Sequence, residues 1–390
     1  MICEVCGIST ASFGLTFFGK ICSACVSHEE RQDQGAVAQN EEYLTSFFSS
    51  RGRQGNTYDC IVPVRPDAED YFTVEYLVKR GLNPLVVLVN NYFLSDIAWH
   101  NFHNMITVYD VDSVTFNPNF SAYKELVRSS LRKLESIYYP YKAILHSYVM
   151  RLAREKNISR VVWGQCQPLE FSGKFSIRDK LKLSKWWVLE HELGGVSENR
   201  FVGTGVHLPR EQLDLLTYPP VSKVKGIQSI FLSNFLVWDQ VEQNALAVTK
   251  GYTAEVAKNT YDPYENTGSS VYYQLHDLLR LQNTRVPKVH EHLARDIRFG
   301  RVIKPENEDK LNDLTPFLAY DIESFFRDFL DTTKSGFDWF VKNRLGSVKH
   351  LIRATADRKI VEEFEFNSSL FTNCDRAESK ISFVKFAKGI

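Results

Sequence analysis

Four cysteines near the start of the chain have the spacing of a metal site. Cys3 and Cys6 are separated by two residues, and so are Cys22 and Cys25. Two tight turns of this kind supply four thiolates to a closed tetrahedral site, which is the arrangement that structural zinc prefers. So short a segment also has too few apolar residues to fold without a metal. We therefore predict a structural zinc ribbon over residues 1–27, with free or disulfide-bonded cysteines as the alternative.

A second set of reactive side chains lies in the stretch YDCIVPVRPDAEDYF, residues 58–72. An apolar run ends at Val64 and an amphipathic stretch follows at once. A turn between a buried strand and a helix lies at the carboxyl edge of a parallel sheet, where α/β proteins bind phosphate. Here the turn consists of Arg65, Pro66, Asp67, Ala68, Glu69 and Asp70. It has no glycine, its proline lacks a backbone donor, and its three carboxylates would repel a polyphosphate.

The elements that would position this turn follow the pattern of an α/β protein. Apolar strand candidates lie at 58–64, 83–90, 106–111 and 159–164, with a further run at 227–238. Helical stretches alternate with them near 70–80, 121–135 and 141–156. Near-continuous apolar strands separated by helices predict a parallel sheet covered on both faces. We expect a zinc ribbon at 1–27, a linker with one helix at 28–56, a Rossmann-like parallel-sheet domain at 57–240 and a mainly helical region at 241–390.

The overall composition favours a soluble, cytoplasmic protein. Lys and Arg together number 47, as do Asp and Glu, so no global charge steers the chain towards nucleic acid or an acidic membrane. There is no apolar run of about 18 residues and no signal segment, so we expect no membrane span. The remaining cysteines, Cys60, Cys166 and Cys374, are far apart, as in proteins of a reducing compartment. Acidic residues directly after the ribbon argue against nucleic acid as its ligand.

Several segments together resemble the N-acetyl sugar amidotransferase family of bacterial surface-polysaccharide (LPS) biosynthesis. They are the ribbon with its spacing, YDCIVPV, GLNPLVV, VVWGQCQPLEFSG, FLVWDQVEQNALAV, QLHDLLRLQ and DIRFGRVIKPE, in order over roughly residues 1–310. The resemblance implies an ATP-pyrophosphatase (PP-loop) fold, like that of the adenine nucleotide alpha hydrolases. It also implies that ATP and magnesium drive replacement of an acetamido oxygen by ammonia, giving an acetamidino sugar. A separate glutaminase, working with a barrel-shaped synthase subunit, would supply the ammonia.

Three segments depart from the pattern of this family. Its Ser-Gly-Gly-Lys-Asp-Ser turn is replaced at all six positions of 65–70. Its Cys-Trp-Pro-Cys-His stretch corresponds here to residues 138–142, YYPYK. Its Trp-Gly-Glu-Asn-Pro-Gln stretch keeps the first two residues but has Gln165 and Cys166 next. The catalytic residues are therefore unknown, and ATP binding is doubtful.

We interpret the chain as a catalytically degenerate relative that binds a sugar nucleotide or the ammonia-supplying subunits and supports an intact paralogue. One alternative is an active amidotransferase with a rebuilt nucleotide site. A tRNA-thiolation protein is a weaker alternative, because its chemistry would need the same ATP turn and reactive cysteines.

The candidate substrate-binding residues come mostly from the segments that carry the resemblance. They are Trp163, Gly164, Glu170, Trp238, Asp239, Arg298 and Arg301. The guanidinium forks of Arg298 and Arg301 match the oxygens of a diphosphate or carboxylate, although a solvated helical face with salt bridges is the alternative. Trp238 could stack on a sugar ring, and a role in the core is its alternative.

Overall fold

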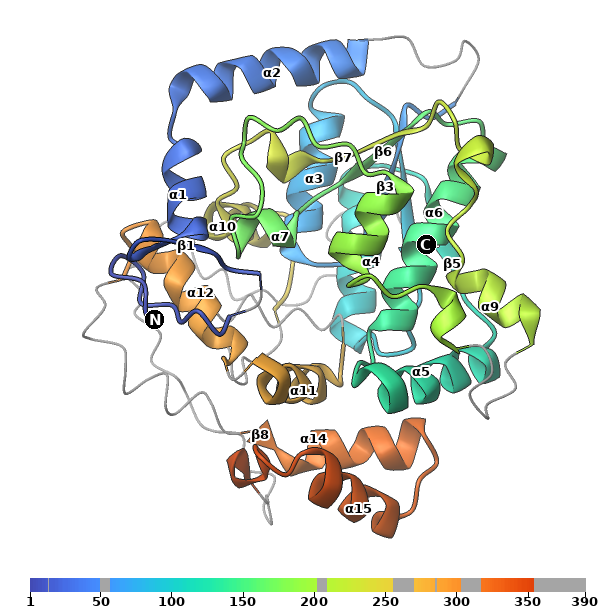
Figure 1. Ribbon diagram of the computed structural model, residues 1–390. Helices are drawn as coiled ribbons and strands as arrows, with labels where there is room; N and C mark the ends of the chain where they lie inside the picture. Colours follow the sequence, from blue (N-terminus) through green and yellow to red (C-terminus); the bar gives the residue numbers. More distant parts are fainter. Residues whose placement is uncertain are drawn as a thin grey trace.

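The computed structural model describes residues 1–12, 14–49, 57–201, 209–254, 270–284, 286–302 and 317–353. At its centre lies a five-stranded parallel sheet with the strand order β5-β4-β3-β6-β7 (Figure 1). The strands are β3 (Cys60–Val64), β4 (Pro84–Val89), β5 (Ser113–Phe116), β6 (Arg160–Trp163) and β7 (Gln228–Phe231). The predicted α/β class with a parallel sheet is confirmed. The strand order reverses between β3 and β6, where sheets of this type form a ligand crevice at their carboxyl edge.

Helices cover both faces of the sheet, so β3 and β4 are buried along their whole length. Successive strand residues point to opposite faces, and Ile61 and Val62 accordingly belong to different apolar clusters. On the face of Val62 lie α2 (Gln34–Ser49), α3 (Ala68–Val78), α4 (Asp96–Val108) and α10 (Gln240–Thr249). On the face of Ile61 lie α5 (Phe120–Leu134) and α6 (Tyr139–Glu155), with α9 (Arg210–Leu216) against them.

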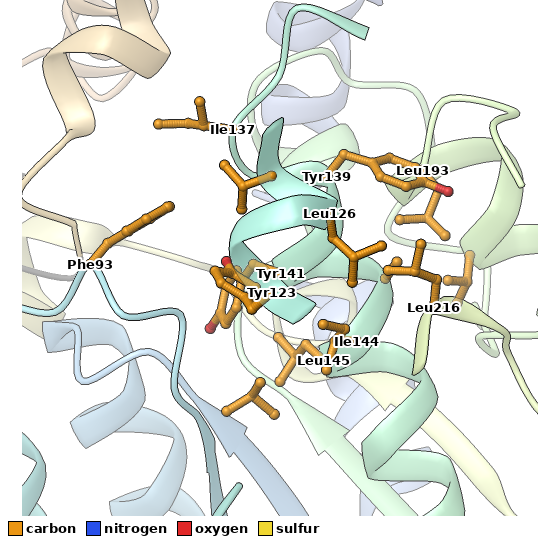
Figure 2. Close-up of a cluster of buried hydrophobic side chains, with 14 of the residues drawn as sticks. Phe93, Tyr123, Leu126, Ile137, Tyr139, Tyr141, Ile144, Leu145, Leu193 and Leu216 are labelled. Atoms are coloured by element: carbon orange, nitrogen blue, oxygen red, sulfur yellow. The ribbon is translucent and has the colours of Figure 1, made fainter. Parts of the chain in front are cut away.

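The apolar face of α6 connects the sheet to the helices outside it (Figure 2). Tyr141 and Leu145 lie on this face, and Tyr141 is close to Tyr123 of α5 in the view. Leu216 of α9 belongs to the same cluster. This packing fixes the position of α6 relative to the sheet.

A small N-terminal unit holds the four cysteines. It consists of the hairpin β1 (Phe17–Phe18) and β2 (Ile21–Cys22), followed by α1 (Ser23–Glu30). In Figure 1 this unit lies beside α12 (Lys288–Arg298). Ala294 of α12 belongs to its apolar cluster, and Arg31 forms a buried ion pair of 2.5 Å with Glu170 of α7 (Gln167–Glu170). The ribbon is thus docked on two segments of the main body.

The described residues after Gln240 lie mainly in helices. This region contains α11 (Tyr273–Thr284), α12, α14 (Ala319–Ser324) and α15 (Lys334–Arg344), with the short parallel strands β8 (Phe317–Leu318) and β9 (Ile352–Arg353). A short helix α8 (Lys185–Trp187) runs into a π-helical turn at Val188–Glu192. Across the described ranges, every helix is too short or too polar to cross a lipid bilayer.

Three sequence-based predictions of local structure need correction. Residues 106–111 do not form a strand, because α4 continues to Val108 and the left-handed residue Asp110 (φ 52°) ends it. The strand lies at β5 instead. In the run 227–238 only β7 is a strand, and a 3-10 turn follows it. Most described residues of the expected linker 28–56 are helical, because α2 begins at Gln34.

Candidate functional site

The four cysteine side chains meet at one point in the ribbon. Their Sγ atoms all lie within 4.8 Å of one another, and all four residues are buried. The separations are 3.8 Å between Cys3 and Cys25, 3.7 Å between Cys6 and Cys22, and 3.5 Å between Cys22 and Cys25. A zinc ion with bonds of about 2.3 Å to sulfur has tetrahedral edges of about 3.8 Å. The four thiolates therefore fit a single tetrahedral ion.

A cavity of about 270 Å³ lies at the carboxyl edge of the sheet, where β3 and β6 end. Pro63 of β3 and Trp163 of β6 both line it. These two strands are paired only at Ile61 and Val161, whereas β3 pairs with β4 along its full length. Pro63 contributes to this difference, because it has no backbone N–H for a further ladder bond. The cavity thus occupies the place that the strand order predicts for a ligand.

The turn after β3 forms one wall of the cavity and is closed by its own side chains. The carboxylate oxygen Oδ2 of Asp70 accepts the backbone N–H of Arg65 at 2.7 Å and that of Asp67 at 3.1 Å. The bond from Asp67 belongs to a capping box at the N-terminus of α3, in which the side chain of the third helical residue, Asp70, accepts the backbone N–H of the N-cap residue. The Arg65 side chain in turn pairs with Asp67 at 3.4 Å and with Glu69. Two backbone donors of the turn, those of Arg65 and Asp67, are thus bonded to a carboxyl group of the same turn instead of to an external anion.

The ionisable side chains of this turn affect one another's pKa strongly because they are buried together. Burial, together with the nearby Asp67 and Glu69, raises the pKa of Asp70 well above its usual range, although Arg65 opposes the shift. The turn thus sets three carboxyl groups, those of Asp67, Glu69 and Asp70, against the single guanidinium of Arg65. The turn is therefore unsuited to a phosphate group.

A second wall of the cavity comes from α6 and the π-helical turn. Lys142 and His146 are four residues apart on α6 and lie 3.2 Å and 3.9 Å from Oε2 of Glu192. Burial alone would raise the pKa of Glu192, but Lys142 and His146 outweigh it and lower this pKa to about 2. The ring of His146 also stacks on Trp163, with 4.5 Å between centroids. Glu192 is consequently ionised and holds both bases in place.

The third wall is formed by α11 and α12. His276 and Arg280 are four residues apart on α11, and Lys288 is the first residue of α12; all three line the cavity. Burial, and then Lys288, Arg280 and Lys142, lower the pKa of His276 to about 3. The imidazole of His276 is therefore neutral near pH 7. Glu291 completes this wall and accepts hydrogen bonds from Arg280 and, at 2.5 Å, from Ser12 of the ribbon.

All three segments that depart from the family pattern reach this cavity. The turn 65–70 lines it with every residue except Pro66. Tyr138, Tyr141 and Lys142 line it from the second segment, and Gln165 from the third. Cys166, next to Gln165, is instead fully buried, and burial raises the pKa of its thiol. Residues more than 70 positions apart in the sequence are thus joined in one site.

Two of the candidate substrate-binding residues lie at the cavity. Trp163 lines it, and its indole Nε1 donates to Ser229 Oγ at 2.8 Å, which fixes the ring. Gly164 also lines it and permits a close approach of α3. A Cβ atom at this position would lie 2.9 Å from Oγ1 of Thr73 and 3.7 Å from the ring of Trp238.

The other candidates lie outside the described lining of the cavity. Glu170 is paired with Arg31 under the ribbon, where both side chains are 6% exposed. Trp238 is 1% exposed and packs edge-on against Phe72. Asp239 caps α10 by accepting the N–H of Val241 at 3.0 Å.

The two candidate arginines, Arg298 at the end of α12 and Arg301 just after it, have other neighbours. Arg301 pairs with Asp239 and lies 3.8 Å from Asp296. Arg298 lies near the ribbon, and its charge acts on Cys6 and on His28. Neither guanidinium is among the cavity-lining groups of the described chain.

Several cavity residues that carry charge or can titrate were not predicted from the sequence, among them His146, Glu192, His276, Arg280, Lys288 and Glu291. The signal was partly present, because Lys142 and His146, like His276 and Arg280, have the four-residue spacing of one helix face. What the spacing could not show was that both faces point into one cavity.

No protein-family model matches the chain, and no curated protein does. Similar solved structures include NMN synthetase from Francisella tularensis, at 14% identity and a TM-score of 0.28, covering 69% of this chain and 98% of that one. They also include the U34-tRNA thiolase NcsA from Methanococcus maripaludis with its [4Fe-4S] cluster, at 10% identity and a TM-score of 0.30, covering 79% and 91%. At these values the similarity is distant, and what is known of the site comes from its own residues.

Proposed function

We propose that this protein is an N-acetyl sugar amidotransferase-like, non-catalytic protein that binds a sugar ligand at the carboxyl edge of its sheet and does not use ATP. The observation that carries the proposal is the closed turn after β3. There Asp70 accepts the backbone N–H groups of Arg65 and Asp67, and Pro66 has none to offer. A phosphate group arriving at α3 would have to displace a carboxyl group that is part of the chain itself.

The charges of the turn also oppose the binding of a triphosphate. The turn sets three carboxyl groups, those of Asp67, Glu69 and Asp70, against the one positive charge of Arg65. A contact of about 4 Å between one carboxylate charge and one phosphate charge costs about 1 kcal/mol in water and on the order of 4 kcal/mol at an effective dielectric constant near 20. Several such contacts would arise with a triphosphate. Magnesium could offset part of this cost, but it does not restore the backbone donors.

The rest of the lining favours a sugar. Aromatic rings that could pack on the apolar face of a pyranose come from Tyr138, Tyr141, Trp163, Phe171 and Tyr273. Amides that could bond its hydroxyl and acetamido groups come from Asn91, Gln165, Gln167, Gln240 and Asn244. Ligand sites of this type combine apolar walls with a few well-placed polar groups. The aromatic and amide groups thus support the sugar part of the proposal.

The ribbon is proposed to hold one structural zinc ion. The sulfur separations fit one tetrahedral ion, and all four ligands are buried, so no position is open for a substrate. A [4Fe–4S] cluster, by contrast, would spread the four thiolates over four different irons. By resemblance, the proposed partners are the ammonia-supplying glutaminase and synthase subunits or an intact copy of the enzyme.

The test is a pair of titrations by isothermal calorimetry, one with ATP and magnesium and one with UDP-N-acetylglucosamine as the sugar probe. We expect heat of binding only for the sugar nucleotide. A pyrophosphate-release assay with all components present tests the rival, an active amidotransferase with a rebuilt site. Release of pyrophosphate above the background of the heat-inactivated protein would contradict the proposal.

Thiolation chemistry is disfavoured by the cysteines outside the ribbon. Among the described residues these are Cys60 and Cys166, and both are fully buried. Burial raises the pKa of Cys60 to about 12 and that of Cys166 still further. A thiolate nucleophile needs a lowered pKa and access to the substrate, and neither residue has them.

A further inference from the structure

We infer that the cavity binds the anionic group of its ligand, a phosphate or a carboxylate, against Lys142, Arg280 and Lys288. This deepens the proposed sugar-binding function and rests on it. The three cations come from three helices, α6, α11 and α12, and all line the cavity. The anion site is therefore not at the turn after β3.

The three cations share one region of the cavity. Each of them acts on the ring of His276, which is the group that their charges and burial keep neutral. A neutral imidazole can still donate one hydrogen bond to an anion. The region thus offers three positive charges and one further donor to a single ligand group.

Carboxylates already contact two of these cations, Lys142 and Arg280. Lys142 lies 3.2 Å from Glu192, and Arg280 bonds Glu291. The second nitrogen of Arg280, Nη1, is buried and has no hydrogen-bond partner among the described residues. Its nearest carboxylate contact, to Asp277 Oδ1, is 3.6 Å, which is too long for a hydrogen bond. Among the described residues Arg280 therefore forms its side-chain hydrogen bond through Nη2 alone.

Aromatic rings lie directly beside these cations. The Lys288 ammonium lies 4.9 Å from the centre of the Tyr273 ring. The Tyr138 ring packs edge-on against His276, with 4.6 Å between centroids. A ligand whose anionic group meets the cations would therefore place its adjoining ring against Tyr138 and Tyr273. This combination fits a sugar that carries a phosphate or a carboxylate better than it fits a free inorganic ion.

The experiment compares the wild type with Lys288→Gln and with Arg298→Gln. Both changes remove one positive charge from α12, but Arg298 is outside the cavity lining, so it serves as the matched control. The probes are UDP-N-acetylglucosamine, N-acetylneuraminic acid, N-acetylglucosamine and inorganic pyrophosphate. They separate a phosphate source from a carboxylate source and from a neutral sugar. Thermal melting of each variant checks that the fold is kept.

We expect Lys288→Gln to weaken binding of at least one anionic sugar about tenfold or more, because a hydrogen bond to a charged group is lost. Arg298→Gln should leave that affinity within about twofold, and rising salt should weaken wild-type binding. Equal affinity of the wild type and Lys288→Gln for every anionic sugar that binds would overturn the anion site and leave sugar binding intact. No binding of any anionic probe would overturn it too. If pyrophosphate bound as tightly as the sugar nucleotide and lost the same factor, the anion site would stand and the proposed sugar recognition would fail.

Discussion

Gly173 is the residue at which the docking of the ribbon can be tested most sharply. It has φ +58°, and a Cβ atom there would lie 2.2 Å from the carbonyl oxygen of Ser23 and 2.7 Å from Cα of Ala24. These are backbone atoms at the start of α1, so no side-chain rotation can relieve the overlap. Gly173→Ala must therefore push the ribbon away from the segment that follows α7.

A matched control exists inside the ribbon. Gly19 has φ +63°, and a Cβ atom there would meet nothing within 4 Å, so Gly19→Ala carries only the conformational cost. That cost is about 1–2 kcal/mol for a left-handed residue and is common to both variants. Overpacking adds about 1–3 kcal/mol, and an overlap with rigid backbone belongs at the upper end. We expect losses of about 3–5 kcal/mol for Gly173→Ala and about 1–2 kcal/mol for Gly19→Ala.

Urea denaturation of the zinc-loaded proteins measures both losses, and the rate of zinc release to a chelator measures how firmly the ribbon is held. Gly173→Ala should release zinc faster than Gly19→Ala does. Equal losses of stability within about 0.5 kcal/mol would refute the close contact between Gly173 and α1, and with it the docked position of the ribbon.

Three further predictions concern single buried groups. Arg31→Met should cost about 3–5 kcal/mol because it leaves Glu170 charged and buried, and the double change with Glu170→Met should recover most of the loss in the same denaturation assay. Metal analysis should find one zinc ion per chain, and Cys22→Ser should abolish retention during gel filtration; a full complement in the variant would contradict the four-thiolate site. The pKa of Glu192 is lowered from 4.5 to about 2, so its ionised form stabilises the fold above about pH 4.5, and this contribution of roughly 3 kcal/mol is lost as the pH falls towards 2. Stability curves against pH should therefore be flatter in this range for Glu192→Gln than for the wild type, and parallel curves would show that Lys142 and His146 do not hold Glu192 ionised.

Patterns in the sequence were sufficient to predict those parts of the fold that depend on residues close together in the chain. The cysteine spacing predicted a compact thiol cluster, and the apolar runs at 58–64 and 159–164 predicted two strands of a parallel sheet. The run 106–111 was wrongly predicted to be a strand because its β-branched residues favour one. In the structure its first residues are instead the end of helix α4. Short apolar runs of this kind are ambiguous unless the tertiary contacts are known.

The cavity could be predicted only in part for the same reason. The turn after β3 is local and was identified from residues 58–72. His276 and Lys288, in contrast, line the same cavity because α11 and α12 pack against the body, which no periodicity encodes. The pairing of Glu170 with Arg31 also depends on where the ribbon docks. Long-range packing therefore decided which candidate side chains share the cavity.

The central claim is that the turn after β3 excludes ATP, and it is tested directly by measuring the affinity for ATP–magnesium before and after the turn is replaced. The comparison uses the wild type and a variant in which residues 65–70 become Ser-Gly-Gly-Lys-Asp-Ser, with thermal melting to confirm that the variant folds. We expect the wild type to bind ATP–magnesium at least about 100-fold more weakly than the variant, which corresponds to about 2.8 kcal/mol. Equal affinities in the micromolar range, or tighter binding by the wild type, would contradict it.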